Sequence, residues 1–173
     1  MALNTLQDLF VDELKDVYSA EKQILQALPK MAKAAGSPDL RRAFETHRQQ
    51  TENQVARLDT IFKQLGASPR GKKCKGMEGL LEEGSERVED EGEEAVIDAG
   101  LIAAAQRVEH YEIAAYGCLQ TYATLLGQEK AATLLEETLQ EEEAADQLLS
   151  KLANGGINQA ALSAVAESGE EEE

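Results

Sequence analysis

Two tight turns most strongly limit the folds that this chain can adopt. Apolar residues recur every three or four positions from residue 5 to residue 65, and this spacing is interrupted around Gly36 and Pro38. A helix that stops at a glycine and restarts at a Ser-Pro pair must turn back within a few residues. The second half of the chain repeats this arrangement around Gly127. We therefore predict two antiparallel helical hairpins, formed by residues 5–35 with 38–65 and by residues 94–126 with 129–153.

A long connection joins the two hairpins. The segment ASPRGKKCKGMEG, residues 67–79, has no periodicity, and an amphipathic pattern over residues 77–90 predicts one short helix. A long crossover between two hairpins is typical of ferritin-like four-helix bundles, whereas a short loop would give an up-down bundle. The predicted fold is therefore all-α, with a ferritin-like four-helix bundle in residues 1–156. An acidic tail, residues 157–173, follows, with at most a short turn of helix near residues 159–165.

Composition disfavours several classes of partner. The 33 acidic residues against 17 basic ones give a net charge of -16, which disfavours nonspecific binding to nucleic acid. No apolar run is long enough for a membrane span or a signal peptide, so we expect a cytoplasmic protein with no membrane partner. The two cysteines, Cys74 and Cys118, are expected to be free thiols in that compartment.

The segment QRVEHYEIAAY, residues 106–116, carries the most unusual chemistry. Glu109 and Glu112 lie three positions apart and therefore share one face of a helix. Apolar residues such as Leu101 and Val108 repeat on the same side, which indicates that this face is turned toward a core. Carboxylates in a core are costly unless something binds them. The pattern therefore predicts a binding site inside the bundle.

Residues at equal distances from a tight turn lie at the same height in a hairpin. In the first hairpin, this rule places Glu21 opposite Thr51 and within about two turns of His47. Glu13 lies nearer the end of the bundle. The first helix therefore offers two candidate ligands, of which Glu21 is preferred.

In the second hairpin, the same rule places Asp146 opposite Glu109. It also places Glu142 or Glu143 opposite Glu112. We prefer Glu142 because it lies on the apolar stripe of its helix. All four long helices thus bring polar groups to one depth of the bundle.

The combined side chains form a ligand set of five carboxylates and one imidazole, which suits two iron or manganese ions. The six candidate metal ligands are Glu21, His47, Glu109, Glu112, Glu142 and Asp146. His110 is expected at the surface or behind a ligand. Alternatively, no metal binds, and the inward acids form hydrogen bonds with Tyr, Thr and Gln side chains and with buried water. Neither interpretation identifies a catalytic residue.

Four segments occur in order, one in each predicted long helix. They read DVYSAEKQILQALPKMAKAA, FETHRQQTENQVARLDTIF, VEHYEIAAYG and LLEETLQEEEAADQLL. These segments resemble the YciF-like family of bacterial ferritin-like stress proteins, over about residues 3 to 153. The resemblance implies a ferritin-like bundle, a cytoplasmic homodimer, a role in general stress responses and a site for two metal ions.

The resemblance to better-known ferritin-like enzymes is less complete. Those oxidases and rubrerythrins carry Glu-x-x-His on their second and fourth helices, and this chain has neither motif: Phe44 stands three residues before His47, and Asp146 three residues after Glu143. The site is accordingly richer in carboxylates. Two functions are therefore considered: metal oxidation by peroxide or oxygen at a di-metal site, and a non-catalytic dimeric scaffold with an empty site.

Overall fold

Helices account for almost all of residues 3–168, the part of the chain that the computed structural model describes, and no strand occurs there. The helical segments are α1 (Leu6–Ala34), α2 (Pro38–Leu65), α3 (Lys75–Glu89), α4 (Glu94–Leu125), α5 (Glu129–Leu152), η1 (Ala153–Ile157) and α6 (Asn158–Ser168). None of them is long and apolar enough to cross a membrane. The predicted boundaries of the four long helices are confirmed to within two residues.

Local sequence sets the ends of the first hairpin. The Thr5 hydroxyl accepts a hydrogen bond from the Asp8 amide at 3.1 Å, and the Asp8 carboxylate accepts one from the Thr5 amide at 3.0 Å. This capping box satisfies amides that would otherwise lack partners. Ser37 caps α2, with Pro38 at its first position, and Gly66, directly after the helix, has the left-handed conformation (φ 62°).

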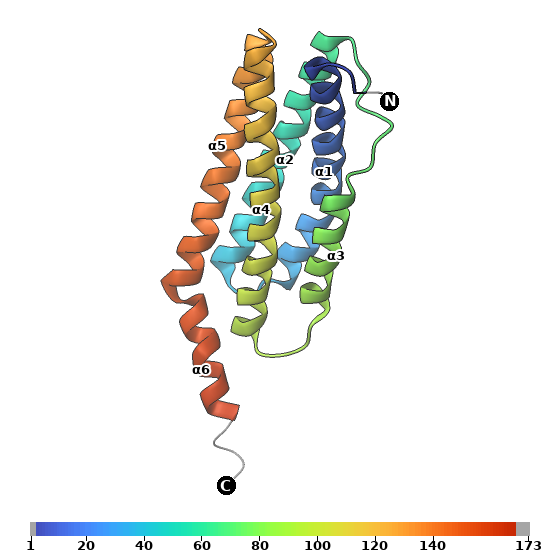
Figure 1. Ribbon diagram of the computed structural model, residues 1–173. Helices are drawn as coiled ribbons and strands as arrows, with labels where there is room; N and C mark the ends of the chain where they lie inside the picture. Colours follow the sequence, from blue (N-terminus) through green and yellow to red (C-terminus); the bar gives the residue numbers. More distant parts are fainter. Residues whose placement is uncertain (1–2, 169–173) are drawn as a thin grey trace.

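The two hairpins pack side by side (Figure 1). In the first, α1 packs against α2, and in the second, α4 packs against α5. Across the bundle, α1 neighbours α4 and α2 neighbours α5. The predicted all-α arrangement of two antiparallel hairpins is therefore confirmed, and so is the crossover with its short helix.

The crossover brings the chain back along the bundle, where α3 packs against α1 and α4. This helix begins at Lys75, two residues before the predicted start, because the thiol of Cys74 caps it by accepting a hydrogen bond from the Met77 amide at 3.3 Å. Cys74 and Met77 are both buried in the core. Both cysteines are free thiols, as predicted: Cys74 is buried and Cys118 is exposed.

The C-terminal segment is more helical than predicted. Helix α5 ends at Leu152, one residue before its predicted end, and Ala153–Ile157 form a π-helical turn with Gly156 at φ 150°. A glycine in this conformation bends the chain, and helix α6 follows, packs against α4 and continues past the end of the bundle (Figure 1). The acidic residues 169–173 lie outside the described residues, so a domain boundary at residue 156 stays a prediction.

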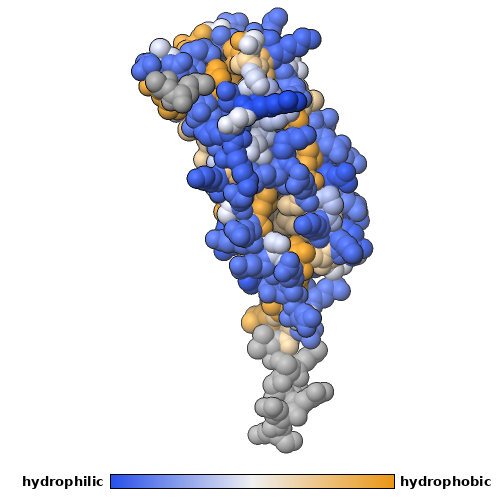
Figure 2. Space-filling view, turned by 90° about the vertical axis from the view of Figure 1, so that its right-hand side faces the viewer, coloured by the Kyte–Doolittle hydropathy of each residue, from blue (hydrophilic) through white to orange (hydrophobic). Residues whose placement is uncertain are grey.

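Two apolar clusters form the core. One lies in the half of the bundle near the α1–α2 turn and contains Ile24 and Leu101, and the other lies in the opposite half and contains Phe10 and Leu119. Each fully buried residue of this size contributes about 1.5–3 kcal/mol relative to an exposed one. Outside this core, hydrophilic residues cover most of the face in Figure 2, and apolar residues appear there only in small patches.

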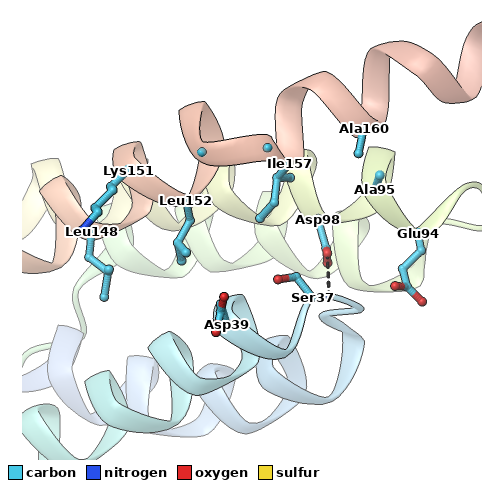
Figure 3. A pocket seen from close by; sticks show the side chains of 12 residues that line it. Ser37, Asp39, Glu94, Ala95, Asp98, Leu148, Lys151, Leu152, Ile157 and Ala160 are labelled. Carbon is cyan, nitrogen blue, oxygen red and sulfur yellow. Dashed lines mark hydrogen bonds between the residues drawn. The ribbon is translucent and has the colours of Figure 1, made fainter.

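A buried carboxylate fixes the α1–α2 turn. Asp98, near the start of α4, is 3% exposed, and its two oxygens accept hydrogen bonds from the amides of Gly36 at 2.9 Å and Ser37 at 2.8 Å. Figure 3 shows Asp98 pointing toward Ser37 beside a cavity of about 630 Å³. This contact ties the turn of the first hairpin to the second hairpin.

Replacing Asp98 by Ala is expected to destabilise the fold, because two partly buried amides lose their charged acceptor. The free energy of unfolding should fall by about 2–4 kcal/mol in urea denaturation. Glu91→Ala removes one charge from an exposed loop position near the same end of the bundle and should change stability by less than about 0.5 kcal/mol. Equal effects of the two variants would contradict the assigned role of Asp98.

Candidate metal centre

Five ionisable side chains meet between the two apolar clusters. Glu21 comes from α1, His47 from α2, Glu109 and Glu112 from α4, and Glu142 from α5. Their exposed fractions are 0, 5, 3, 1 and 0%, respectively. Together these five residues are called the carboxylate cluster below. All five side chains are therefore buried inside the bundle.

Four members of the carboxylate cluster lie close enough to hold one ion. His47, Glu109, Glu112 and Glu142 each offer one ligand atom, and these four atoms lie within 4.8 Å of one another. The Nε2 atom of His47 lies 3.5 Å from Glu109 Oε1 and 3.6 Å from Glu142 Oε2. Neither contact has hydrogen-bond geometry, so this nitrogen has no hydrogen-bond partner.

Glu21 lies beside these four residues. One of its oxygens accepts a hydrogen bond from the hydroxyl of the fully buried Tyr116, and its other oxygen has no partner. Glu13, the alternative candidate from the same helix, is only half-buried and lies near Lys72. The structure therefore favours Glu21 as the contribution of α1.

Asp146 is the one candidate ligand that the structure does not bring into the carboxylate cluster. Its Oδ1 atom accepts a hydrogen bond from Gln106 at 3.0 Å and lies 3.3 Å from the Nε2 atom of the exposed His110. Four helical residues advance about 400°, so Asp146 is turned by about 40° from the direction of Glu142. Asp146 was predicted at the height of Glu109, but its side chain contacts Gln106 and His110 of α4 and does not point into the carboxylate cluster.

Two supporting residues hold Glu142 and its neighbour. The amide nitrogen of Gln54 donates to Glu142 Oε1 and, at 3.0 Å, to Glu141 Oε2. Arg57 forms two hydrogen bonds with the Glu141 carboxylate, both at 2.7 Å. Although burial opposes it, this pairing holds the pKa of Glu141 below its usual value. Gln54 stands between the apolar residues of α2, which is an unusual position for a polar side chain, whereas a surface arginine gives no comparable signal.

Burial and charge repulsion raise the proton affinity of the carboxylate cluster. The pKa values of Glu21, Glu109 and Glu112 lie well above the usual value of 4.5, first because burial penalises the charged form. Repulsion among neighbouring carboxylates, including that of Glu142, raises all three further. Without a cation, these groups therefore hold protons at pH values where a solvated glutamate is ionised.

The unpaired atoms test whether the residues suit a metal. Six buried atoms of the carboxylate cluster have no hydrogen-bond partner: Glu21 Oε2, His47 Nε2, Glu109 Oε2, both carboxylate oxygens of Glu112 and Glu142 Oε2. Such atoms are rare in folded proteins unless an ion or water binds them. Five of the six are carboxylate oxygens and one is an imidazole nitrogen, which are donors that manganese and iron accept. The residues present therefore fit a metal centre.

The fold and this cluster define a class, the helical bundle proteins with a carboxylate-rich core. More particularly, the chain belongs to the family described as "Domain of unknown function (DUF892)", whose model matches residues 5–162. It is 46% identical over 162 residues to Protein YciF of Escherichia coli strain K12, covering 93% of this chain and 98% of that protein. The sequence resemblance to the YciF-like family is thereby confirmed.

Solved structures agree with this assignment. The crystal structure of the E. coli stress protein YciF matches with a TM-score of 0.87, covering 90% of this chain and 99% of YciF. YcfI of Rhodopseudomonas palustris, whose description suggests a structural role, matches with a TM-score of 0.82 at 41% identity, covering 85% and 94% of the two chains. A Xanthomonas campestris protein with 24% identity and a TM-score of 0.71 covers 91% and 96%, and supports the fold alone.

The stability of the metal-free protein should fall as the pH rises from 5 to 8. Glu21, Glu109 and Glu112 have raised pKa values in the folded state, so the unfolded chain releases their protons first. Their contribution is complete below the unfolded value of 4.5 and is lost as the pH rises toward the folded pKa. Each proton that the folded protein keeps and the unfolded chain has released adds about 1.4 kcal/mol per pH unit to this decline. Urea denaturation of chelator-treated protein across this range measures the slope.

The variant Glu112→Gln tests this assignment, because glutamine keeps the shape of the side chain and removes its ionisation. Its metal-free form should show a smaller decline in stability between pH 5 and pH 8. Glu143→Gln, at an exposed position on α5, should leave the wild-type slope unchanged. A metal-free protein whose stability increases across this range would contradict the raised pKa values.

Proposed function

We propose that this protein is a ferritin-like stress-response protein that binds two iron or manganese ions in its core. The six unpaired atoms of the carboxylate cluster carry this proposal, because buried ionisable atoms without partners are costly. A pair of cations would complete their coordination. The similarity to the E. coli stress protein YciF supports the assignment to stress responses.

The five residues of the carboxylate cluster would be divided between the two ions. His47, Glu109, Glu112 and Glu142 would hold one ion, since their ligand atoms already lie within 4.8 Å of one another. Glu21 would hold the second together with Glu112 and Glu142, whose charges act most directly on it. When bound, the ion pair would supply the electrons that reduce hydrogen peroxide or dioxygen.

The residues around the cluster would keep these ligands in place. Tyr116 donates a hydrogen bond to Glu21, and Gln54 donates one to Glu142, so each carboxylate keeps one oxygen free. Hydrogen bonds of this kind orient metal ligands and favour their ionised form. The apolar clusters on both sides exclude bulk water from the site.

A metal-free scaffold is the second candidate function. In that case the raised pKa values of Glu109 and Glu112 would leave protonated carboxyl groups that donate hydrogen bonds to their neighbours. The structural role suggested for the R. palustris relative favours this candidate. The two candidates differ in one measurable property, the response of the melting temperature to metal and to chelators. The homodimer and the cytoplasmic location stay predictions.

Anaerobic titration of chelator-treated protein with Fe(II) or Mn(II) tests the metal proposal. We expect two ions per chain by elemental analysis and a higher melting temperature, because a ligand that binds only the folded state stabilises it by about 2.7 kcal/mol at 100 times Kd. With Fe(II) bound, addition of peroxide should produce a change in the optical spectrum. A scaffold would show no stoichiometric metal and no shift of the melting temperature.

Matched variants separate the ligands from the general acidity of the chain. Glu112→Gln should weaken metal binding by about 100-fold or more, since it removes a charged ligand. Its metal-free form should remain folded, because the substitution also removes charge repulsion from the core. Glu143→Gln removes the same charge from an exposed position on α5 and should bind metal as the wild type does. Equal affinities in the two variants would contradict the assigned site.

A further inference from the structure

One cavity reaches the carboxylate cluster from outside. It has a volume of about 130 Å³ and lies between α2 and α5, where His47 and Glu109 form part of its wall. These two residues are the members of the cluster with the largest exposed fractions, 5 and 3%. Cavities of about 630, 200, 240 and 390 Å³ elsewhere in the described part of the chain have no cluster residue in their walls.

The same helix interface is closed on the other side of the cluster. There Arg57 of α2 bridges to α5 through Glu141 at 2.7 Å and Glu137 at 3.3 Å, and Gln54 donates to Glu141 and Glu142. The α2–α5 interface thus has one half joined by charged and polar contacts and one half that contains the cavity. Small molecules would meet less resistance in the second half.

The opposite face of the cluster is also covered. On the α1–α4 side, the fully buried Tyr116 lies against Glu21. Helix α3 packs over the α1–α4 face, and its cap residue Cys74 lies 3.0 Å from the hydroxyl of Tyr111. Access from this direction would require α3 to separate from the bundle.

Small side chains keep the cavity open. Ala43 of α2 lines one wall, and Ala144 and Ala145 of α5 line the other. Ala43 and Ala145 are half-buried and Ala144 is exposed, so the cavity extends from the surface to the imidazole of His47. Gln50, also half-buried, lies at the wall with its side-chain oxygen 3.4 Å from His47 Nδ1. Larger residues at the alanine positions would fill this space.

We propose that this α2–α5 cavity is the entrance to the carboxylate cluster, used by divalent cations and by molecules of the size of water, dioxygen or hydrogen peroxide. Its volume of about 130 Å³ is sufficient for molecules of this size. The negative charge of Asp146 acts on Glu109, a wall residue of the cavity, and so favours cations there. This inference rests on the proposed metal site.

Filling the cavity from either wall should slow metal entry without removing a ligand. The variants Ala145→Leu and Ala43→Leu keep good helix propensity and add bulk to opposite walls. With Co²⁺ as an optical probe in stopped-flow mixing, each should lower the rate of binding about 10-fold or more. The final amount of bound Co²⁺ should stay as in the wild type. Ala56→Leu, the same change at an exposed position on α2, should leave the rate unchanged.

Unchanged binding rates in both folded wall variants would overturn the proposed entrance. If one variant lowers the melting temperature strongly, the other still decides, because the two walls belong to different helices. Slow binding in one folded wall variant together with the wild-type rate in Ala56→Leu would support the entrance.

A second measurement does not depend on metal. The chain has two histidines, so deuterium exchange at the imidazole C2 carbon of His47 can be compared by mass spectrometry with that of the exposed His110. In metal-free protein, Ala145→Leu should slow exchange at His47 several-fold and leave His110 unchanged. Absence of Co²⁺ binding in the wild type would refute the metal site. The deuterium exchange rates at His47 would then be the test of whether small molecules reach the cluster through this cavity. Equal rates at His47 in wild type and variant would refute the entrance.

Discussion

The burial of acidic side chains in the middle of the bundle is the constraint on which the rest of the structure depends. Four glutamates and one histidine occupy a buried layer between two apolar clusters that supply the stability of the fold. Such a layer has two ways to reduce its electrostatic cost: the carboxyl groups take up protons, or cations bind them. Whether these carboxyl groups are protonated or ionised therefore depends on whether cations are bound.

The geometry of this layer depends on the relative height of the two hairpins. The first hairpin contributes Glu21 and His47 and the second contributes the other three residues, so the cluster exists only if both keep their register. A slip of one helical turn would move the two halves apart by about 5.4 Å, which exceeds the 4.8 Å span of the four ligand atoms. Asp98 binds the turn of one hairpin from a helix of the other, and thus fixes the register.

Much of this arrangement could be predicted from the sequence, because the helix period and the two tight turns fix both the face and the height of a residue. Glu109, Glu112 and Glu142 are buried where these rules place them. The rules predict the height of a residue better than the direction of its side chain. Asp146 is turned by about 40° from Glu142, and its side chain accepts a hydrogen bond from Gln106 instead of entering the carboxylate cluster.

Other features depend on contacts that sequence spacing does not encode. The partners of Asp98 are backbone amides 61 and 62 residues away, and an amide gives no signal of its need for an acceptor. The role of Arg57 could not be predicted for a related reason: a long charged side chain usually lies at the surface, and its role follows only from the position of Glu141 across the interface. The helix after Gly156 packs against α4, a contact that the sequence of this alanine-rich segment does not encode.

The α2–α5 interface shows how stability and access compete in one structure. On one side of the cluster, Arg57 and Gln54 join the helices through charged and polar contacts. On the other side, alanines leave a cavity that larger apolar residues would fill with a gain in packing energy. A bundle that exchanges ions or small molecules needs such a space, and it needs it at the wall formed by His47 and Glu109.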